Sequence, residues 1–429
     1  MKNFEYYAPT RVVFGKETEK QVGALIHSLG CQKALVLFGG NSAQRSGLLE
    51  QIYGSLSEFG ISFITLGGVV PNPVLSKVYE GIKICKNERI DFILAVGGGS
   101  VIDTAKAIGY GVTNEGDVWH FYNGKRKPSS CLPIGTILTI AGSGSEMSYC
   151  SIITNEDGNL KRACNSDLGR CKFVIMNPEL TYTLPKWQTA CGCTDILMHS
   201  MERYFSSEPS MEVTDKISES IMRTVIHNSK ILMKDPKNYK ARAEIMWTAS
   251  LSHNDLTGCG AVSDWATHQL EHELSGMFNI SHGAGLAALW GSWARYVLKT
   301  NPNRFMQFAS QVLNIPCNFF APEKTALEGI ETLEEFFISL GMPVKISNLK
   351  IALTESQIEE LAQNCSFKNQ RTIGNFKVLY KEDMKKIYWL AVLPYVAFLP
   401  LMAVVNKTEP YVLGFPLIFF WLIFWACAG

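Results

Sequence analysis

The chain has 429 residues, with 40 Lys or Arg against 39 Asp or Glu, so its formal net charge is +1. This length exceeds that of one ordinary domain and predicts two domains that share a cleft. The balanced charge, without long runs of one sign, argues against nucleic acid or anionic lipid as a partner and favours a small molecule. The N-terminus lacks a secretory signal and the 12 cysteines are scattered, so we expect a cytoplasmic main body with reduced thiols.

Residues 1–183 alternate apolar, β-rich segments with helical segments. The β-rich segments lie at 33–40, 61–69 and 91–100, and a helical pattern follows each of them. Strands that are apolar throughout and alternate with helices form a parallel sheet covered on both faces. We therefore predict an α/β fold with a Rossmann-like N-terminal domain that binds a dinucleotide.

A glycine-rich turn follows the segment at 91–100. Gly98, Gly99 and Ser100 precede a sequence with the composition of a starting helix. Glycines let the backbone approach a pyrophosphate, and the N-terminus of a helix favours its negative charge. Ile102 stands where the third glycine of the G-x-G-x-x-G pattern would be, so a plain tight turn is the alternative.

A second glycine-rich turn follows the first β-rich segment, where such sheets often hold the adenosine end of a dinucleotide. It contains Gly39, Gly40 and Asn41, and no Asp or Glu stands there to bind a ribose 2′-hydroxyl. Arg45 could pair with a 2′-phosphate, so the segment favours NADP(H) over NAD(H). A surface arginine that is merely solvated is the alternative.

A third polar turn at 141–146, which contains Ser143, follows another apolar segment together with Thr139. It could line the nicotinamide end of a coenzyme or be only a loop. From about Pro185 the β-rich segments stop, and the segments at 187–205, 211–233, 239–256 and 262–275 have the apolar spacing of helices. The sequence therefore predicts an all-helical C-terminal domain at 184–387.

Two segments of this helical half place metal-ligand residue types on one helix face. Asp195 and His199 are four residues apart, as are His268 and His272, and His282 follows in a glycine-flanked turn. One Asp with three His suits a divalent ion such as Fe²⁺ or Zn²⁺ and leaves positions open for a substrate.

The alternative is that each histidine caps or packs a helix. Four of the 8 histidines lie in these two segments, and this clustering favours a site over coincidence. His120 and His253 have no such neighbours, and we interpret them as structural or cleft-lining residues. The Cys191–Cys193 pair could be a redox or metal site, but helix packing is favoured.

Four motifs carry a resemblance to a known family. GGGSVIDTAK at 97–106, AGSGSEMS at 141–148, DILMH at 195–199 and HQLEHELSGMFNISHGAGLA at 268–287 closely resemble the iron-containing (group III) alcohol dehydrogenases. Within that family the chain looks most like the NADPH-dependent butanol dehydrogenase and aldehyde reductase branch, and the similarity runs from the first residues to about Ile387. The resemblance implies a dinucleotide-binding α/β domain followed by a helical domain.

The resemblance also implies roles for single residues. Asp195, His199, His268 and His282 match the metal ligands, whereas His272 matches a nearby non-ligand histidine and is our candidate for the proton path. Ser143 stands where relatives often have threonine and keeps the hydroxyl. The implied coenzyme contacts are Gly98, Gly99, Ser100 and Asp103 at the pyrophosphate, with Thr139, Ser143 and Lys161 farther along.

The implied activity is hydride transfer between NAD(P)H, with NADPH favoured, and short aliphatic aldehydes such as butanal, with one divalent ion, Fe²⁺ or Zn²⁺, at the substrate oxygen. Two other hypotheses stay open. One is related glycerol dehydrogenase or sugar-phosphate cyclase chemistry, although no basic cluster suits a phosphorylated substrate. The other is a membrane-anchored protein that binds metal or nucleotide without turnover. A homodimer is expected by default.

Residues 388–429 differ from the rest of the chain. Two apolar stretches without charge, at 388–405 and 411–429, are each about long enough to span a bilayer and are separated by NKTEP. They predict an additional apolar helical-hairpin tail, with the main body on the cytoplasmic side because Lys385 and Lys386 precede it. The tail resembles short two-span bacterial membrane proteins. Three origins stay open: a joining of two unrelated genes, which is favoured, a membrane anchor, and a helical pair packed on the body.

Overall fold

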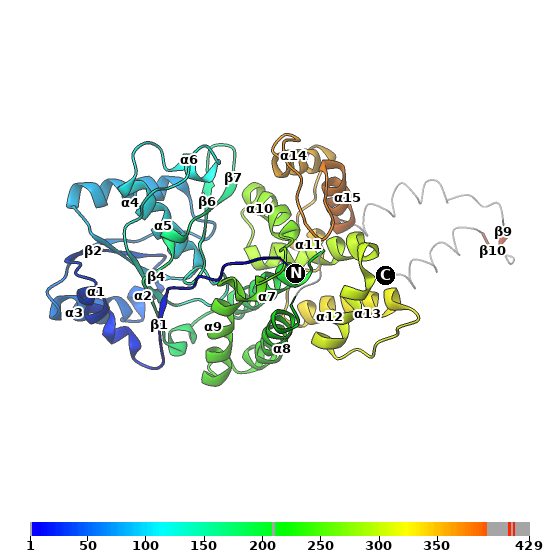
Figure 1. The fold of residues 1–429 in the computed structure, drawn as a ribbon, viewed down its shortest axis with the longest axis horizontal. Helices are drawn as coiled ribbons and strands as arrows, with labels where there is room; N and C mark the ends of the chain where they lie inside the picture. Colours follow the sequence, from blue (N-terminus) through cyan, green and yellow to red (C-terminus); the bar gives the residue numbers. More distant parts are fainter. Residues whose placement is uncertain (1, 208–210, 393–410, 413–414, 417–429) are drawn as a thin grey trace.

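The structure is a computed structural model that describes residues 2–207, 211–392, 411–412 and 415–416 (Figure 1). Sheet and helices of the N-terminal half lie at one end of the molecule, and a helical half lies beside them. The main sheet has the order β1 (Arg11–Phe14), β8 (Phe173–Met176), β5 (Ile134–Leu138), β4 (Phe92–Gly97), β2 (Lys33–Phe38) and β3 (Ser62–Leu66).

All neighbouring strands of this sheet are parallel, as the sequence predicted. Their apolar side chains alternate between two cores. In β2, Leu35 and Leu37 join the core that contains α4 and α5, whereas Ala34 and Val36 join the core that contains α1 and α3. The sheet is therefore buried on both faces, which is why its strands are apolar throughout.

The helices of this half are α1 (Val22–Ser28), α2 (Ser42–Arg45), α3 (Leu48–Glu58), α4 (Leu75–Glu88), α5 (Gly99–Thr113) and α6 (Trp119–Tyr122). Because β2 leads outward to β3 while β4 leads in the other direction to β5, the order of the sheet reverses between β2 and β4. A crevice for ligands forms at such a point, beyond the carboxyl ends of the strands. The turns after β2, β4 and β5 open there.

An antiparallel hairpin of β6 (Cys150–Asn155) and β7 (Leu160–Asn165) stands between β5 and β8 in the chain. The sequence analysis did not predict it. The hairpin lies against α5 on one side and α10 on the other, and it brings Lys161 to the boundary between the two halves.

The second half is helical, as predicted. Each predicted helical segment corresponds to a helix whose ends lie within four residues of the predicted ends. The helices are α7 (Lys186–Tyr204), α8 (Glu212–Lys234), α9 (Tyr239–His253), α10 (Ala266–Phe278), α11 (His282–Val297), α12 (Pro302–Leu313), α13 (Pro322–Ser339), α14 (Glu355–Cys365) and α15 (Lys381–Val392). Short 3-10 helices are η1 (Thr18–Gln21), η2 (Asp167–Gly169), η3 (Pro178–Thr181), η4 (Leu256–Gly258), η5 (Leu298–Thr300) and η6 (Ile346–Leu349).

The last helix runs five residues past the predicted end of the body at Ile387. Tyr388 is fully buried, and its hydroxyl donates to the carbonyl of Leu270 at 2.8 Å, so these residues pack as part of the body. Most of the predicted apolar hairpin, from 393 onward, lies outside the described residues. Two short strands, β9 (Tyr411–Val412) and β10 (Phe415–Pro416), pair where the second helix of that hairpin was expected to start. A proline at position 416 disfavours a continuous helix through this segment.

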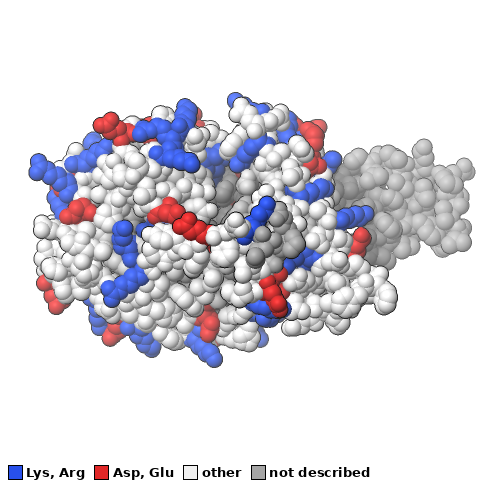
Figure 2. All heavy atoms as spheres, viewed as in Figure 1, with Lys and Arg blue, Asp and Glu red and all other residues white. Residues whose placement is uncertain are grey.

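Among the helices that the structure describes, none has both the length and the apolar composition needed to cross a bilayer. On the face shown in Figure 2, basic and acidic side chains are interspersed, in keeping with the balanced composition.

Candidate metal and coenzyme site

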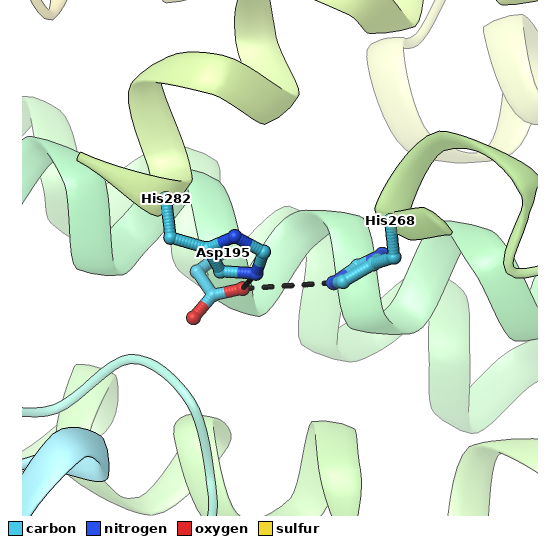
Figure 3. A group of neighbouring side chains, drawn as sticks. All are labelled: Asp195, His268 and His282. Carbon is cyan, nitrogen blue, oxygen red and sulfur yellow. Dashed lines mark ion pairs between the residues drawn. The ribbon is translucent and has the colours of Figure 1, made fainter. Parts of the chain in front are cut away.

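One carboxylate and three imidazoles meet where three helices converge. Asp195 and His199 lie on α7, His268 on α10, and His282 is the first residue of α11. Oδ1 of Asp195 is 3.6 Å from Nε2 of His199, 3.7 Å from Nε2 of His268 and 3.6 Å from Nε2 of His282. In Figure 3, dashed lines mark the approach of Asp195 to His268 and His282.

These distances fit donors that share one ion. They exceed hydrogen-bond length, and ligands about 2.1 Å from a tetrahedral ion are about 3.4 Å apart. Among the described residues, Oδ1 of Asp195 and Nε2 of His268 are buried without a hydrogen-bond partner. Unpaired buried polar atoms are costly. A divalent ion such as Fe²⁺ or Zn²⁺ would satisfy them together, so the residues present fit a metal.

Two further carboxylates hold the ring nitrogens that face away from this point. Oε1 of Glu202 is 3.0 Å from Nδ1 of His268, and Oε2 of Glu271 is hydrogen-bonded to Nδ1 of His282. Both carboxylates are buried. Such pairs fix the orientation of a ligating ring and leave Nε2 free for an ion.

The pKa values follow from these contacts. Burial lowers the pKa of His268, but the carboxylates of Asp195 and Glu202 outweigh it and raise that pKa to about 9. Burial, with nearby His253 and His268, holds the pKa of His199 well below its ordinary value. Burial raises the pKa of Glu271, but His282 and Lys161 lower it to about 2. The group therefore combines buried carboxylates with histidines whose pKa values shift in opposite directions.

Glycines allow the supporting helices to approach closely. A Cβ atom on Gly283 would lie 2.2 Å from the carbonyl oxygen of Cys191, so the start of α11 can rest on α7 only without a side chain there. A Cβ atom on Gly192 would lie 2.2 Å from the carbonyl oxygen of Ala141, which brings α7 against the third glycine-rich turn. The metal group, which is the set of Asp195, His199, His268 and His282, is thereby held beside the edge of the sheet.

A cleft with a volume of about 1360 Å³ runs along this edge between the two halves. All the predicted site residues line it. They are Gly39, Gly40, Asn41, Gly98, Gly99, Ser100, Asp103, Thr139, Ser143 and Lys161 from the coenzyme set, with Asp195, His199, His268, His272 and His282 from the helical half.

The glycine-rich turn after β4 leads directly into the N-terminus of α5. β4 ends at Gly97, α5 begins at Gly99, and both glycines line the cleft. The N-terminus of α5, whose first N–H groups have no helical partners, therefore lies at the cleft. A Cβ atom on Gly99 would lie 2.3 Å from Oγ of Ser143, so only glycine lets the turn after β4 approach the third turn this closely.

Asp103 is engaged within the protein. Its carboxylate accepts from Oγ of Ser145 at 2.5 Å and from the backbone N–H of Ile152 at 3.2 Å, which ties the third turn and the hairpin to α5. Lys106, which the sequence analysis did not single out, is fully buried and donates to the carbonyls of Ser145, Ser148 and Cys150. Both side chains therefore hold the third turn and the start of the hairpin against α5.

His253 lines the cleft, which is one of the two roles that the sequence analysis left open for it. Its Nδ1 is 2.6 Å from the carbonyl oxygen of Ser143, and its ring centroid is 3.9 Å from that of His199. The sequence analysis missed Trp265 and Glu202. Trp265 adopts a left-handed backbone (φ 61°) and places its ring centroid 5.1 Å from that of His268. Glu202 could have been found from its position seven residues after Asp195, on the same face of the helix.

Comparison with known proteins gives matches over almost the whole described body. The model of iron-containing alcohol dehydrogenase matches residues 9–178, and the C-terminal model of the same family matches residues 189–392. A probable NADH-dependent butanol dehydrogenase of Bacillus subtilis (strain 168) is 39% identical over 387 residues, covering 90% of this chain and 99% of the relative.

An NADPH-dependent aldehyde reductase of Escherichia coli (strain K12) is 30% identical, again over 90% of this chain and 99% of its own length. The crystal structure of an NADH-dependent butanol dehydrogenase A from Thermotoga maritima covers 91% of this chain and 99% of that chain, with 36% identity and a TM-score of 0.88. These matches confirm the resemblance seen in the four motifs. The chain belongs to the iron-containing alcohol dehydrogenase family.

Proposed function

We propose that the chain is a metal-dependent alcohol dehydrogenase that uses NAD(P)H to reduce short aliphatic aldehydes such as butanal, and runs the reverse oxidation. The observation that carries this proposal is the convergence of Nε2 of three histidines on Oδ1 of Asp195, in the cleft that the glycine-rich turns line. Relatives named as butanol dehydrogenases and an aldehyde reductase support the substrate class.

A divalent ion at this group supplies a Lewis acid for the substrate oxygen, and the coenzyme supplies or accepts the hydride. The chain itself positions both reactants. The free N–H groups at the start of α5 would hold the pyrophosphate, and the contact between Gly99 and Ser143 would keep the nicotinamide end beside α7. Close, oriented approach of the reacting carbons is the main contribution expected of the protein.

His272 is proposed to move the proton. Its Nε2 is buried and has no hydrogen-bond partner among the described residues, and His272 lines the cleft beside His282. Burial, Lys161 and His282 hold its pKa well below the ordinary value. The ring is therefore neutral in the free protein, and Nε2 can accept the proton of an alcohol during oxidation.

The choice of coenzyme is a finer proposal. We favour NADP(H) because Arg45 lines the cleft near Gly40 and Asn41, and no acidic side chain lies in that turn. Relatives that are 36–39% identical are named as NADH-dependent and one that is 30% identical as NADPH-dependent, so the two coenzymes must be compared directly.

Three further proposals concern organisation. A domain boundary at 183/184 is supported by the end of β8 at Met176 and the start of α7 at Lys186. A homodimer is supported by β1, which lies at the edge of the sheet with a single neighbour, β8. Membrane attachment rests only on the apolar sequence after Val392. Light scattering tests the dimer, and pelleting of the full chain with membranes tests the attachment.

The test of the function uses the full chain freed of metal by a chelator. Oxidation of NADPH and of NADH with butanal should be absent in the metal-free protein and should return with Fe²⁺ or Zn²⁺. Coenzyme binding without turnover in the metal-loaded protein would instead support a binding protein, and turnover of glycerol but not butanal would support a glycerol dehydrogenase.

A further inference from the structure

Lys161, Glu271 and His282 form a polar connection between the two halves of the chain. Nζ of Lys161 on β7 is 3.4 Å from Oε2 of Glu271 on α10, and the same oxygen is hydrogen-bonded to Nδ1 of His282. The side chains of Lys161 and Glu271 are 5% and 0% exposed. Water and salt screen such a buried pair only weakly. A change in the position or charge of Lys161 therefore alters the electrostatic environment of Glu271 and His282.

Asn72, in the loop after β3, extends this connection. Its Oδ1 accepts from Nζ of Lys161 at 3.1 Å, and its Nδ2 donates to Oδ1 of Asn279 at 3.0 Å and to the carbonyl of Ile280 at 3.1 Å. Asn279 and Ile280 form the turn that leads into His282. The N-terminal half therefore holds both the ring of His282 and the backbone that carries it.

Lys161 also faces the cleft. Its ammonium group has three N–H donors, and two of them meet Asn72 and Glu271 within the described part of the chain. Hydride transfer requires the nicotinamide to touch the substrate carbon at the metal. Since only Glu271 separates Lys161 from His282, the third donor is placed to meet a polar group at the nicotinamide end of a coenzyme.

His268 provides an internal contrast. Its Nδ1 is also held by a buried carboxylate, that of Glu202, but Oε2 of Glu202 has no hydrogen-bond partner among the described residues. Among the described residues, no lysine links the carboxylate of Glu202 to the N-terminal half, as Lys161 links that of Glu271. The side chain of His282 is 24% exposed and that of His268 is 5% exposed, so packing fixes His282 less firmly.

We propose that Lys161 and Glu271 are positioning residues that couple coenzyme binding to metal binding through His282. The inference rests on the proposed function. Contact with the coenzyme immobilises Lys161, Lys161 immobilises Glu271, and Glu271 orients His282 so that Nε2 faces the ion. By linkage, the coenzyme strengthens metal binding by the same factor by which the metal strengthens coenzyme binding.

The test measures zinc affinity of the metal-free full chain against a chromophoric chelator, with and without saturating NADPH and, separately, NADH. Wild-type protein should bind zinc about 5-fold tighter or more when the coenzyme is present. Lys161→Met and Glu271→Gln should bring this ratio close to one. Lys161→Arg, which keeps the cation, should retain most of it.

Glu202→Gln is the matched control, because it removes the other carboxylate that holds a histidine of the group. Both Glu202→Gln and Glu271→Gln should weaken zinc binding about 10- to 100-fold, but only Glu271→Gln should lose the effect of coenzyme. A wild-type ratio of one, or an unchanged ratio in Lys161→Met and Glu271→Gln, overturns the coupling. Butanal reduction by wild-type protein loaded with Zn²⁺ or with Fe²⁺ is measured in parallel. Turnover with a ratio of one refutes only the coupling, whereas metal and coenzyme binding without turnover with either ion refutes the proposed function.

Discussion

At the scale of single residues, the metal group depends on each of its donors. His268→Ala removes one of the three imidazoles that face Asp195, and the remaining donors no longer enclose an ion. We expect metal content to fall below about one tenth of the wild-type value and aldehyde reduction to fall at least about 100-fold. Elemental analysis after purification without air measures the first effect. His27 is an exposed histidine outside the cleft, so His27→Ala should change neither metal content nor aldehyde reduction. Normal metal content in His268→Ala would refute the assignment of His268 as a ligand.

Arg45 tests the proposed coenzyme preference. A charged hydrogen bond to a 2′-phosphate stabilises binding by about 1.5–3 kcal/mol. Arg45→Ala should therefore lower kcat/KM for NADPH roughly 10- to 150-fold and leave kcat/KM for NADH unchanged. Steady-state kinetics with butanal give both values. Equal losses of kcat/KM with the two coenzymes would show that Arg45 does not bind the 2′-phosphate of NADPH.

Asp103 makes stability depend on pH. Burial raises its pKa to about 6, although Lys106 and Ser145 oppose the shift. An unfolded Asp titrates at about 3.9, so the folded state holds a proton that the unfolded state releases between these values. The contribution of Asp103 to stability is therefore present below the lower pKa and is lost as pH rises through the higher one. From about pH 4.5 to 7.5, wild-type protein should lose about 2 kcal/mol of unfolding free energy relative to Asp103→Asn. Urea unfolding at both pH values measures it, and a constant difference would contradict the shift.

At the scale of elements, we propose that the contact between α7 and the third glycine-rich turn sets the distance between a bound metal ion and a bound coenzyme. Gly192 lies on α7 three residues before Asp195, and its Cα would be 3.1 Å from a Cβ atom on Gly142. No side chain fits between the helix and the turn. A side chain at Gly192 would push α7, with Asp195 and His199, away from the third turn.

Gly192→Ala should therefore lower kcat/KM about 100-fold, because a displacement on the order of 1 Å between reactants has that effect. Metal content should stay near the wild-type value, since all four donors remain. Gly54→Ala on α3 is the matched control: a Cβ atom there meets nothing within 4 Å, and the variant should keep its activity and gain about 0.5–1 kcal/mol of stability. Equal kinetics in the two variants would show that the contact at Gly192 does not position the reactants.

At the scale of the whole molecule, α15 is the last helix of the folded body of the enzyme. Tyr388 is fully buried and bonded to Leu270, which lies on α10 between His268 and His272. The match to the C-terminal family model also extends to the end of this helix, at residue 392.

A chain that ends after Val392 should keep the activity and thermal stability of the full chain. A chain that ends after Ile387 lacks Tyr388 and the buried Ala391 and Val392, and should lose at least about 3–5 kcal/mol of unfolding free energy. Thermal unfolding of the two truncated chains measures the difference. Equal stability would show that the last turn of α15 does not contribute to the fold.

The sequence by itself determined the parallel sheet, the helical half and the family, because these depend on local patterns. Apolar segments followed by glycine-rich turns indicated β2 and β4, and four-residue spacing put Asp195 and His199 on one face of α7. The hairpin at 150–165 was missed because it is short and takes its place from packing on α5 and α10.

Only the tertiary structure decided which side chains surround the proposed metal-ligating and coenzyme-binding residues. That Glu271 meets Lys161, 110 residues earlier in the chain, and that Asp103 holds Ser145 inside the protein, follow from how α10, β7 and α5 pack together. No local spacing encodes such pairs. Burial and distance alone set their charges and hydrogen bonds, and both exist only once the two halves of the chain have come together.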